Sequence, residues 1–242
     1  SYFCATSSGY ETINTMHTYT QSLQALLSQH ANAKQAAPMA KYMRDQFSFL
    51  GIKTPQRREL LKQFIAEQGK PPLDDLETIL RDLWQLPQRE YQYSALTLLD
   101  KWEKKLPPEF VNVLEYLVVT KSWWDTVDLI AGHPVATHFS RFPQIRDEFV
   151  AQWRASDNFW LRRTALLFQL HYKTRTDVDL LFALIHENLD SDEFFIQKAI
   201  GWALREYSKT DADAVIAFVD VTSLAPLSAR EALKWLKNQG RV

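Results

Sequence analysis

The segment "TKSWWDTVD" places two adjacent tryptophans before two carboxylates. On a helix, Trp124 and Asp128 are four residues apart and project from the same face, about one turn apart. Neighbouring helical residues point about 100° apart, so Trp123, which pairs with Val127, is predicted to pack in the core while Trp124 is displayed. Asp125 lies off the Trp124 face, and we expect it to be a structural or solvated acid. The segment therefore offers one tryptophan and one carboxylate for chemistry.

Two later residues extend this set. Arg163 comes thirty-nine residues after Trp124, and Trp202 comes thirty-nine residues after Arg163. If successive repeats place them on one strip, the chain presents two indole rings, an anion and a cation together. Indole faces attract cations and arginine binds phosphate, which suits an alkylated, cationic purine nucleotide in DNA. A carboxylate such as Asp128 can stabilise the oxocarbenium-like sugar as the N-glycosidic bond breaks, and it can also orient water.

The sequence lacks the motifs that metal-dependent, serine-hydrolase or classical nucleotide-binding chemistry would require. The six histidines show no HExxH or comparable metal-binding spacing. The sequence contains no GxSxG, Walker or GxGxxG motif, and the helix-hairpin-helix pattern of many glycosylases is not apparent. We therefore expect no metal and no cofactor.

Composition sets the class of protein. The chain has 242 residues, 46% of them hydrophobic, which fits one large globular unit or two small ones. With 28 basic and 29 acidic residues the formal charge is -1, which neither requires nor excludes a nucleic-acid partner. The single cysteine, Cys4, excludes disulfides within the chain. No run of about 18 apolar residues suggests a membrane span, and a cytoplasmic protein is expected.

The two ends of the chain differ in character. Residues 1–15 have no helical period, and we interpret them as a leader or a cloning remnant, with Met16 the expected native start. Residues 16–242 are expected to form a single domain. There the apolar residues recur every three or four positions, and prolines fall between the periodic segments, as in "TPQRRELLKQFIAEQ". The prediction is an all-α fold.

Alanines at similar places in several apolar helices suggest an internal repeat. The intervals between Ala95, Ala131, Ala165, Ala199 and Ala232 are 36, 34, 34 and 33 residues. A period near 34 is typical of two-helix repeats that bury their apolar faces against their neighbours. We predict a curved solenoid with a concave face. The alternative is a non-repetitive bundle in which the alanines mark tight helix contacts.

Several long segments carry a family resemblance. "MAKYMRDQFSFLGIKTPQRRELLK", "REYQYSAL", "TKSWWDTVD", "SDNFWLRRTALLFQLHYK" and "EFFIQKAIGWALREYSKT" together resemble the AlkD-type family of bacterial DNA alkylation repair enzymes, from about Met39 to Lys237. The resemblance implies a monomeric solenoid of HEAT-like repeats that holds duplex DNA in its concave face. It also implies excision of cationic N3- and N7-alkylated purines, such as 3-methyladenine and 7-methylguanine, without full insertion of the lesion into a protein pocket.

The resemblance also implies roles for individual residues. The catalytic aspartate of the family falls on Asp128, its sugar-contacting tryptophans on Trp124 and Trp202, and its arginine beside the lesion phosphate on Arg163. Further positions match less decisively or are basic residues of the matched segments, and we predict that they contact DNA: Tyr42, Phe194, Phe195, Lys41, Arg44, Arg162 and Lys198.

Each of these residues also has a structural interpretation. Trp202 sits in core-like "AIGWAL", although Gly201 leaves room beside its backbone, and the basic residues could be ordinary solvated helix faces. Two functions therefore compete: an alkylpurine DNA glycosylase that initiates base excision repair, and a non-catalytic DNA-binding or scaffold protein with the same fold. The surroundings of Asp128 discriminate between them.

Overall fold

The computed structural model describes residues 15–242, which fold into helices and the connections between them. No β-strand forms within that range, where the extended pairing is an isolated bridge between Ser48 and Gln88. The all-α prediction is confirmed. The predicted leader, residues 1–15, lies outside the described residues except for its last position. None of the helices in the described range is long and apolar enough to span a membrane.

A set of helices recurs at a constant interval along the chain. These helices are α3 (Thr54–Gln68), α5 (Arg89–Asp100), α7 (Trp124–Ile130), α10 (Phe159–Leu167) and α12 (Phe194–Ser208). Each begins 35 residues after the one before it. The predicted repeat is confirmed, and its period is 35 rather than 34. The alanine intervals were uneven because Ala95 and Ala165 are the seventh residues of their helices, whereas Ala199 is the sixth of its helix.

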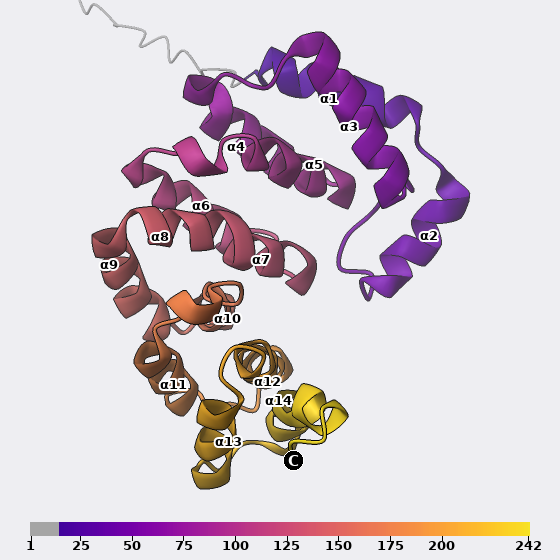
Figure 1. Ribbon diagram of the computed structural model, residues 1–242. Helices are drawn as coiled ribbons and strands as arrows, with labels where there is room; N and C mark the ends of the chain where they lie inside the picture. The colour runs from indigo at the N-terminus through magenta and orange to yellow at the C-terminus, as the bar shows by residue number, and fades with distance from the viewer. Residues whose placement is uncertain (1–14) are drawn as a thin grey trace, which may run out of the picture.

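Each repeat pairs one of these helices with a partner that precedes or follows it. The partners that precede them are α1 (Thr18–Gln29), α4 (Leu76–Gln85), α6 (Val111–Val119), α9 (Pro143–Arg154) and α11 (Val178–His186), and α13 (Ala212–Val221) follows the last repeat helix. In α4 the buried residues Leu76, Ile79, Leu80, Leu83 and Trp84 recur at helical spacing and form a single apolar stripe. Such stripes meet between the helix layers, where the core lies. Figure 1 shows the pairs following one another in an arc.

One helix of the arc is extended through an irregular turn. α7 continues through the π-helical turn η4 (Ala131–Val135), which contains Pro134, into α8 (Ala136–Arg141). Proline cannot donate the hydrogen bond that a regular helix needs at that point, and a π turn accommodates the missing bond. In Figure 1 this helix runs from α7, on the side that faces α2, to α8 beside α9.

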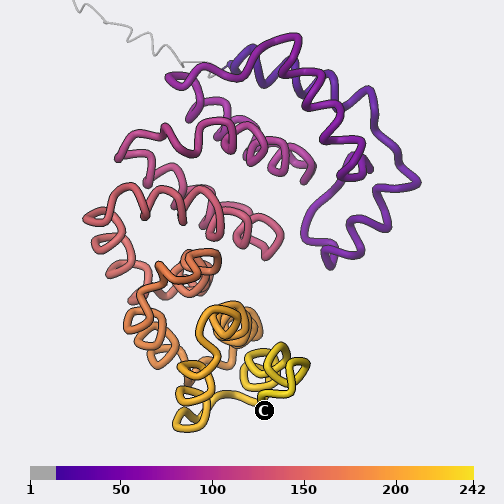
Figure 2. Tube along the Cα trace, in the orientation of Figure 1, coloured from indigo at the N-terminus to yellow at the C-terminus, as the bar shows by residue number. Residues whose placement is uncertain are grey.

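The helix α2 (Ala33–Tyr42) stands apart from the arc, opposite the start of α7 (Figures 1 and 2). None of its residues is fully buried. Its first turn is fixed by Gly51, whose φ is +92° and where a Cβ would lie 2.0 Å from the carbonyl oxygen of Asn32. Only glycine fits such a position. The amide of Asn32 donates to the carbonyl of Leu50, so the start of α2 is held while its other end carries Tyr42 toward the arc.

Candidate active site

The constant period aligns chemically active side chains across the arc. The fifth residue of each repeat helix forms a row consisting of Arg58, Tyr93, Asp128, Arg163 and Lys198. The predicted interval of thirty-nine residues is one period of 35 plus one helical turn of four. Trp124, Arg163 and Trp202 are therefore the first, fifth and ninth residues of successive helices, and they cross the inner face diagonally.

The centre of this row is an ion pair between adjacent repeats. The Nε and Nη2 atoms of Arg163 donate to the two carboxylate oxygens of Asp128 over 2.8 and 3.0 Å. Arg163 also donates through Nη1 to the carbonyl oxygen of Phe195, so its guanidinium is fixed between α7 and α12. The side chains of Asp128 and Arg163 are 15% and 5% exposed. The carboxylate therefore keeps access to solvent while its partner is buried.

Burial raises the pKa of the Asp128 carboxyl above its ordinary value of 3.8. The hydrogen bonds and the positive charge of Arg163 offset part of this effect. Both carboxylate oxygens accept hydrogen bonds from the guanidinium, which is the arrangement expected of the ionised form.

The neighbouring acid, Asp125, has a different environment. One of its oxygens accepts hydrogen bonds from Arg89 and the Thr126 amide over 2.7 and 3.0 Å. The other oxygen accepts from Arg89 and the Tyr93 hydroxyl over 2.9 and 2.6 Å. Since a carboxylate oxygen has two lone pairs, Asp125 is saturated. It is the structural acid that the sequence favoured, because it ties α7 to α5.

The carboxylate of Asp128, by contrast, has unused hydrogen-bond acceptor sites. Within residues 15–242 its hydrogen bonds come from Arg163 alone, one to each oxygen. Each oxygen therefore retains a lone pair, and the side chain borders two cavities. A water molecule or a positively charged group in those cavities can interact with Asp128 without displacing Arg163.

The larger cavity, of about 800 Å³, lies between α2, α3 and α7. Its lining includes Tyr42 from α2, Arg58 from α3 and the two residues Trp124 and Asp128 from α7. Tyr42 is 73% exposed, and its ring meets the Trp124 ring edge-on at 6.2 Å between centroids. The end of α2 and the start of α7 thus form an aromatic corner beside the carboxylate.

A smaller cavity of about 290 Å³ lies toward α12 and α14 (Pro226–Asn238). Trp124, Asp128 and Trp202 border both cavities and so stand between them. This is the grouping that the sequence predicted for the catalytic residues. The smaller cavity is also lined by charged or aromatic side chains, namely Arg163, Phe194, Phe195, Lys198, Arg205 and Glu231.

The two adjacent phenylalanines have different environments: Phe194 is exposed at the cavity, whereas Phe195 packs toward the interior. Phe194 is 53% exposed at the cavity. Phe195 packs against Trp123 and Trp160, with ring centroids 5.1 and 4.9 Å away. Trp123 itself precedes the helix in extended conformation, since α7 begins at Trp124. The expectation that Trp123 is helical is wrong, although its packing toward the core is as predicted.

Three predicted DNA contacts lie outside these cavities. Lys41 and Arg44 are exposed at the end of α2 and are not among the residues that line either cavity. Arg162 points elsewhere, because its guanidinium donates to the Ser156 carbonyl over 2.6 Å and to the Asn188 side chain over 3.2 Å. For Arg162 the contacts are those of a structural residue, and its DNA contact stays a prediction.

Glu231 is a site residue that the sequence did not suggest. Its carboxylate lies 3.1 Å from Lys198 and 2.9 Å from Arg205. These two cations lower the pKa of Glu231 despite the opposing effect of its burial. The signal that could have found it was Gly201: a Cβ there would lie 2.9 Å from the Ser228 carbonyl and 2.5 Å from the Glu231 Cβ. The room beside Gly201 is therefore taken by α14, rather than left open at the cavity.

Row members Arg58 and Tyr93 were also overlooked. Both line the larger cavity and both follow directly from the period of 35. Arg57, next to Arg58, lies over the Tyr93 ring at 4.9 Å, and burial lowers its pKa to about 10. The interval between helix starts, unlike the interval between alanines, places both residues in the row.

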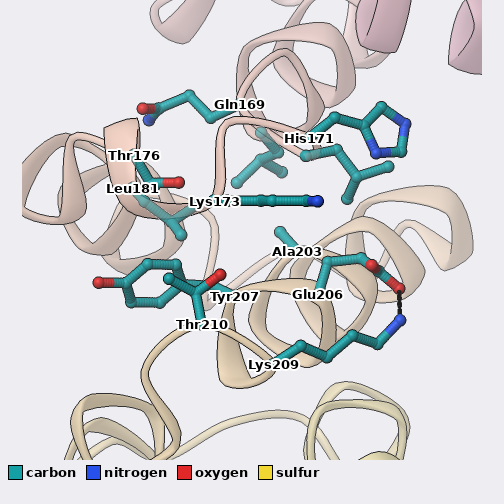
Figure 3. A pocket seen from close by; sticks show the side chains of 12 residues that line it. Gln169, His171, Lys173, Thr176, Leu181, Ala203, Glu206, Tyr207, Lys209 and Thr210 are labelled. Carbon is teal, nitrogen blue, oxygen red and sulfur yellow. Dashed lines mark hydrogen bonds and ion pairs between the residues drawn. The ribbon is translucent and has the colours of Figure 1, made fainter.

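Other hollows lie outside this row. Figure 3 shows one of about 340 Å³ between α10, the turn η5 (Lys173–Arg175) and α12, lined by side chains that include His171 and Glu206. It contains no residue predicted for catalysis. Among residues 15–242, no group of three or more histidines, cysteines or acids is arranged to hold a metal ion.

Comparison with known proteins agrees with the sequence resemblance. A family described as "DNA alkylation repair enzyme" matches residues 23–236. A solved structure described as a predicted DNA alkylation repair enzyme from Enterococcus faecalis is 37% identical to this chain, with a TM-score of 0.79. The similarity covers 85% of this chain and 96% of that one. Comparison with curated proteins gives no match. The family match spans the repeat helices and Asp128, and the chain belongs to the DNA alkylation repair enzyme family.

Proposed function

We propose that this protein is a DNA glycosylase that hydrolyses the N-glycosidic bond of cationic N3- and N7-alkylated purines in duplex DNA. The observation that carries the proposal is the state of Asp128. It forms a two-point ion pair with Arg163, retains a free lone pair on each oxygen, and stands between Trp124 and Trp202 at two open cavities.

The chemistry requires little help at the base. An N3- or N7-alkylated purine carries a positive charge, so it leaves as a neutral base when its bond to C1′ breaks. Positive charge then develops on the sugar, and water adds to C1′ with loss of its proton to solvent. The demand on the protein is stabilisation of that cationic sugar. A carboxylate about 4 Å away supplies about 4 kcal/mol at an effective dielectric constant of about 20.

The two tryptophans fit the same demand. Both are half-buried, and they flank the carboxylate at the boundary between the cavities. Indole faces contribute about 0.5–2 kcal/mol to the binding of a nearby cation. They also exclude water from one side of the sugar, which strengthens its attraction to Asp128. We propose that the lesion is processed there without insertion of the base into a protein pocket.

The cations around the cavities suit the flanking phosphates. Arg163, Lys198 and Arg205 line the smaller cavity, and Arg58 lines the larger one. Phosphate contacts position a protein on DNA without reading its sequence. This arrangement supports recognition of a damaged nucleotide by the charge of its base and the position of its backbone.

A non-catalytic scaffold is the second candidate, and one observation favours it. The Asp128–Arg163 pair joins α7 to α10 much as the Asp125–Arg89 pair joins α5 to α7. A purely structural acid, however, is expected to be saturated with hydrogen bonds, as Asp125 is by its four donors although it also lines the larger cavity. Asp128 differs, since half of its acceptor sites are free and its side chain reaches both cavities.

Incubation with duplex DNA that contains N7-methylguanine or N3-methyladenine tests the proposal. The glycosylase releases free base and leaves an equal amount of abasic DNA, which are measured by mass spectrometry and by alkaline strand cleavage. Binding of the same DNA without base release would identify the protein as a scaffold.

A further inference from the structure

A row of basic residues follows the ends of the repeat helices, away from Asp128. Lys70, Lys104, Arg141, Arg175 and Lys209 are separated by 34, 37, 34 and 34 residues. Each lies at the end of a repeat helix, at the end of its continuation α8, or in the connection that follows. Cations are favoured at helix C-termini by about 0.3–1 kcal/mol, which alone would account for a basic residue near such an end.

The three central members do more than cap helices, because they surround a cavity. Lys104, Arg141 and Arg175 line a hollow of about 530 Å³ together with the hydroxyl-bearing residues Thr137 and Ser140. Among the described residues, none that lines this hollow carries a carboxylate. An acid that does contact its lining is Glu103, which accepts a hydrogen bond from Thr137. We call this hollow the edge cavity.

The guanidinium groups at the edge cavity are held in place with donors left over. Arg141 donates through Nη1 to the Leu106 carbonyl over 2.7 Å. Arg175 donates through Nη1 to the Ser140 hydroxyl over 2.8 Å. A guanidinium has five N–H donors, so each internal bond fixes the group and leaves most of its donors for an anion. Arginine forks of this kind match the geometry of phosphate oxygens.

A series of hollows leads from the candidate active site toward the edge cavity. The large cavity beside Asp128 shares Arg57, Arg58, Tyr93 and Leu129 with a second hollow of about 570 Å³, which extends along α3 and α5 to His133. The His133 ring lies 5.6 Å from the His171 ring, which lines the edge cavity. A ligand that extends along these hollows from Asp128 would therefore approach the edge cavity.

The hollow in Figure 3 lies on the other side of His171. There the Lys173 side chain extends across the hollow between His171 and Glu206. Burial and the neighbouring His133 lower the pKa of His171, so this residue is neutral near pH 7. The positive charge beside the edge cavity therefore comes from the lysines and arginines.

From these contacts we propose that the edge cavity binds a backbone phosphate of the DNA that flanks the lesion, and that Lys104, Arg141 and Arg175 hold it. This inference rests on the proposed binding of duplex DNA at the active site, and it adds a second contact at a defined distance. The run from Trp124 to Arg141 spans roughly 27 Å at 1.5 Å per residue. For a duplex that lies along α7 and α8, at about 3.4 Å per base pair, the contacted phosphate lies about eight base pairs from the lesion.

That distance makes duplex length the critical variable in a test. A duplex of about 10 base pairs with a central tetrahydrofuran abasic analogue reaches only about 17 Å to each side, whereas one of about 30 base pairs reaches about 50 Å. The triple variant Lys104→Gln/Arg141→Gln/Arg175→Gln should lose at least about tenfold in affinity for the long duplex. Its plot of log affinity against log salt should be shallower by about 1 for the long duplex, since one phosphate contact is lost. For the short duplex, affinity and slope should match those of the wild type.

A matched pair of single variants guards against misfolding of the triple variant. Lys104→Gln should lower affinity for the long duplex by about threefold and make its salt dependence shallower, whereas Lys105→Gln should change neither. Both lysines are exposed in the same short helix, η2 (Glu103–Lys105), but Lys105 does not line the edge cavity.

Several outcomes would overturn the proposal. Equal losses on both duplexes, or no loss on either, would mean that the edge cavity does not contact flanking DNA. Stabilisation of the wild type by sodium pyrophosphate, lost in Lys104→Gln while DNA binding is unchanged at both lengths, would assign the cavity to a free polyphosphate instead. Failure of the proposed glycosylase function is seen separately, as absence of base release by the wild type.

Discussion

Replacement of Asp128 by asparagine isolates the charge that the proposed mechanism needs. Asparagine keeps the shape of the side chain, so the cavities beside Trp124 and Trp202 are preserved. A unit charge about 4 Å from the cationic sugar is worth about 4 kcal/mol at an effective dielectric constant of about 20. Since each ~1.36 kcal/mol changes a rate tenfold, base release should slow by about a thousandfold. The negative charge does not attract phosphate, so DNA affinity should fall by no more than about threefold.

The assay is single-turnover release of 7-methylguanine from duplex DNA, with protein in excess over both DNA and Kd so that binding does not limit the rate. The Asp128→Asn change replaces one of the two oxygens that accept from Arg163 by an amide NH2, and the guanidinium donor left unsatisfied is expected to cost about 1–3 kcal/mol in unfolding free energy. Urea unfolding must therefore show that the variant is folded at the assay temperature. A release rate within about threefold of the wild type, in a folded variant, would refute the role of the charge. Equal losses of binding and release would make Asp128 a structural residue.

Four further changes have defined outcomes. Asp125→Asn, in the saturated and buried pair with Arg89, should cost about 3–5 kcal/mol in urea unfolding; a loss below about 1 kcal/mol would contradict its structural role. Glu231→Gln removes the carboxylate that competes with phosphate for Lys198 and Arg205, so affinity for undamaged duplex DNA should rise several-fold. Fluorescence anisotropy measures this affinity, and weaker binding would contradict the expectation. Gly201→Ala introduces a Cβ 2.9 Å from the Ser228 carbonyl oxygen in α14 and should lower the free energy of unfolding by about 1–3 kcal/mol. An unchanged midpoint of urea unfolding would show that α14 shifts freely. Because the folded-state pKa of Asp128 is raised, the rate of base release should decline on acidification with a midpoint above pH 3.8. Considered alone, Asp128 should increase the free energy of unfolding as the pH falls from its folded-state pKa to 3.8. A decline in rate with a midpoint at or below pH 3.8 would contradict the effect of burial.

Helical periodicity accounts for how much of the fold could be predicted. The stripe of α4, from Leu76 to Trp84, is visible in the sequence because a buried face must recur at helical spacing. The period itself was harder to obtain, since alanines mark close packing and not a fixed position in the helix. Ala199 is displaced by one residue from the position of Ala95 and Ala165 for this reason. Helix starts give the regular interval because capping and loop geometry repeat with the fold.

At the site, the sequence predicted relations between residues of one helix correctly, but it did not predict features that depend on the backbone conformation of loops or on contacts between helices. Trp124 and Asp128 were paired correctly because four residues make one helical turn. Trp123 was placed on the same helix, but its extended backbone belongs to the preceding loop. Glu231 is brought to the cavity by the approach of α14 to Gly201; the glycine indicates a close contact, but no local pattern identifies Glu231 as the residue that makes it.

The position of α2 likewise could not be predicted from local sequence patterns. Tyr42 was predicted from the family resemblance, but its distance from Trp124 depends on Gly51 and on the loop that returns to α3. Arg162 shows the opposite problem, because its neighbour Arg163 points to the cavity while Arg162 is turned toward Ser156. Adjacent charged residues on a helix face different directions, and composition alone cannot separate them.

Stabilisation of a cationic sugar by Asp128 is tested most directly with DNA analogues of the reaction. A duplex that carries a positively charged pyrrolidine in place of the lesion sugar imitates the transition state, and a duplex with neutral tetrahydrofuran is its matched control. The wild type should bind the cationic duplex at least about a hundredfold more tightly, and Asp128→Asn should abolish most of that preference. Equal affinity of the wild type for the two duplexes would contradict the proposed catalytic role of the site.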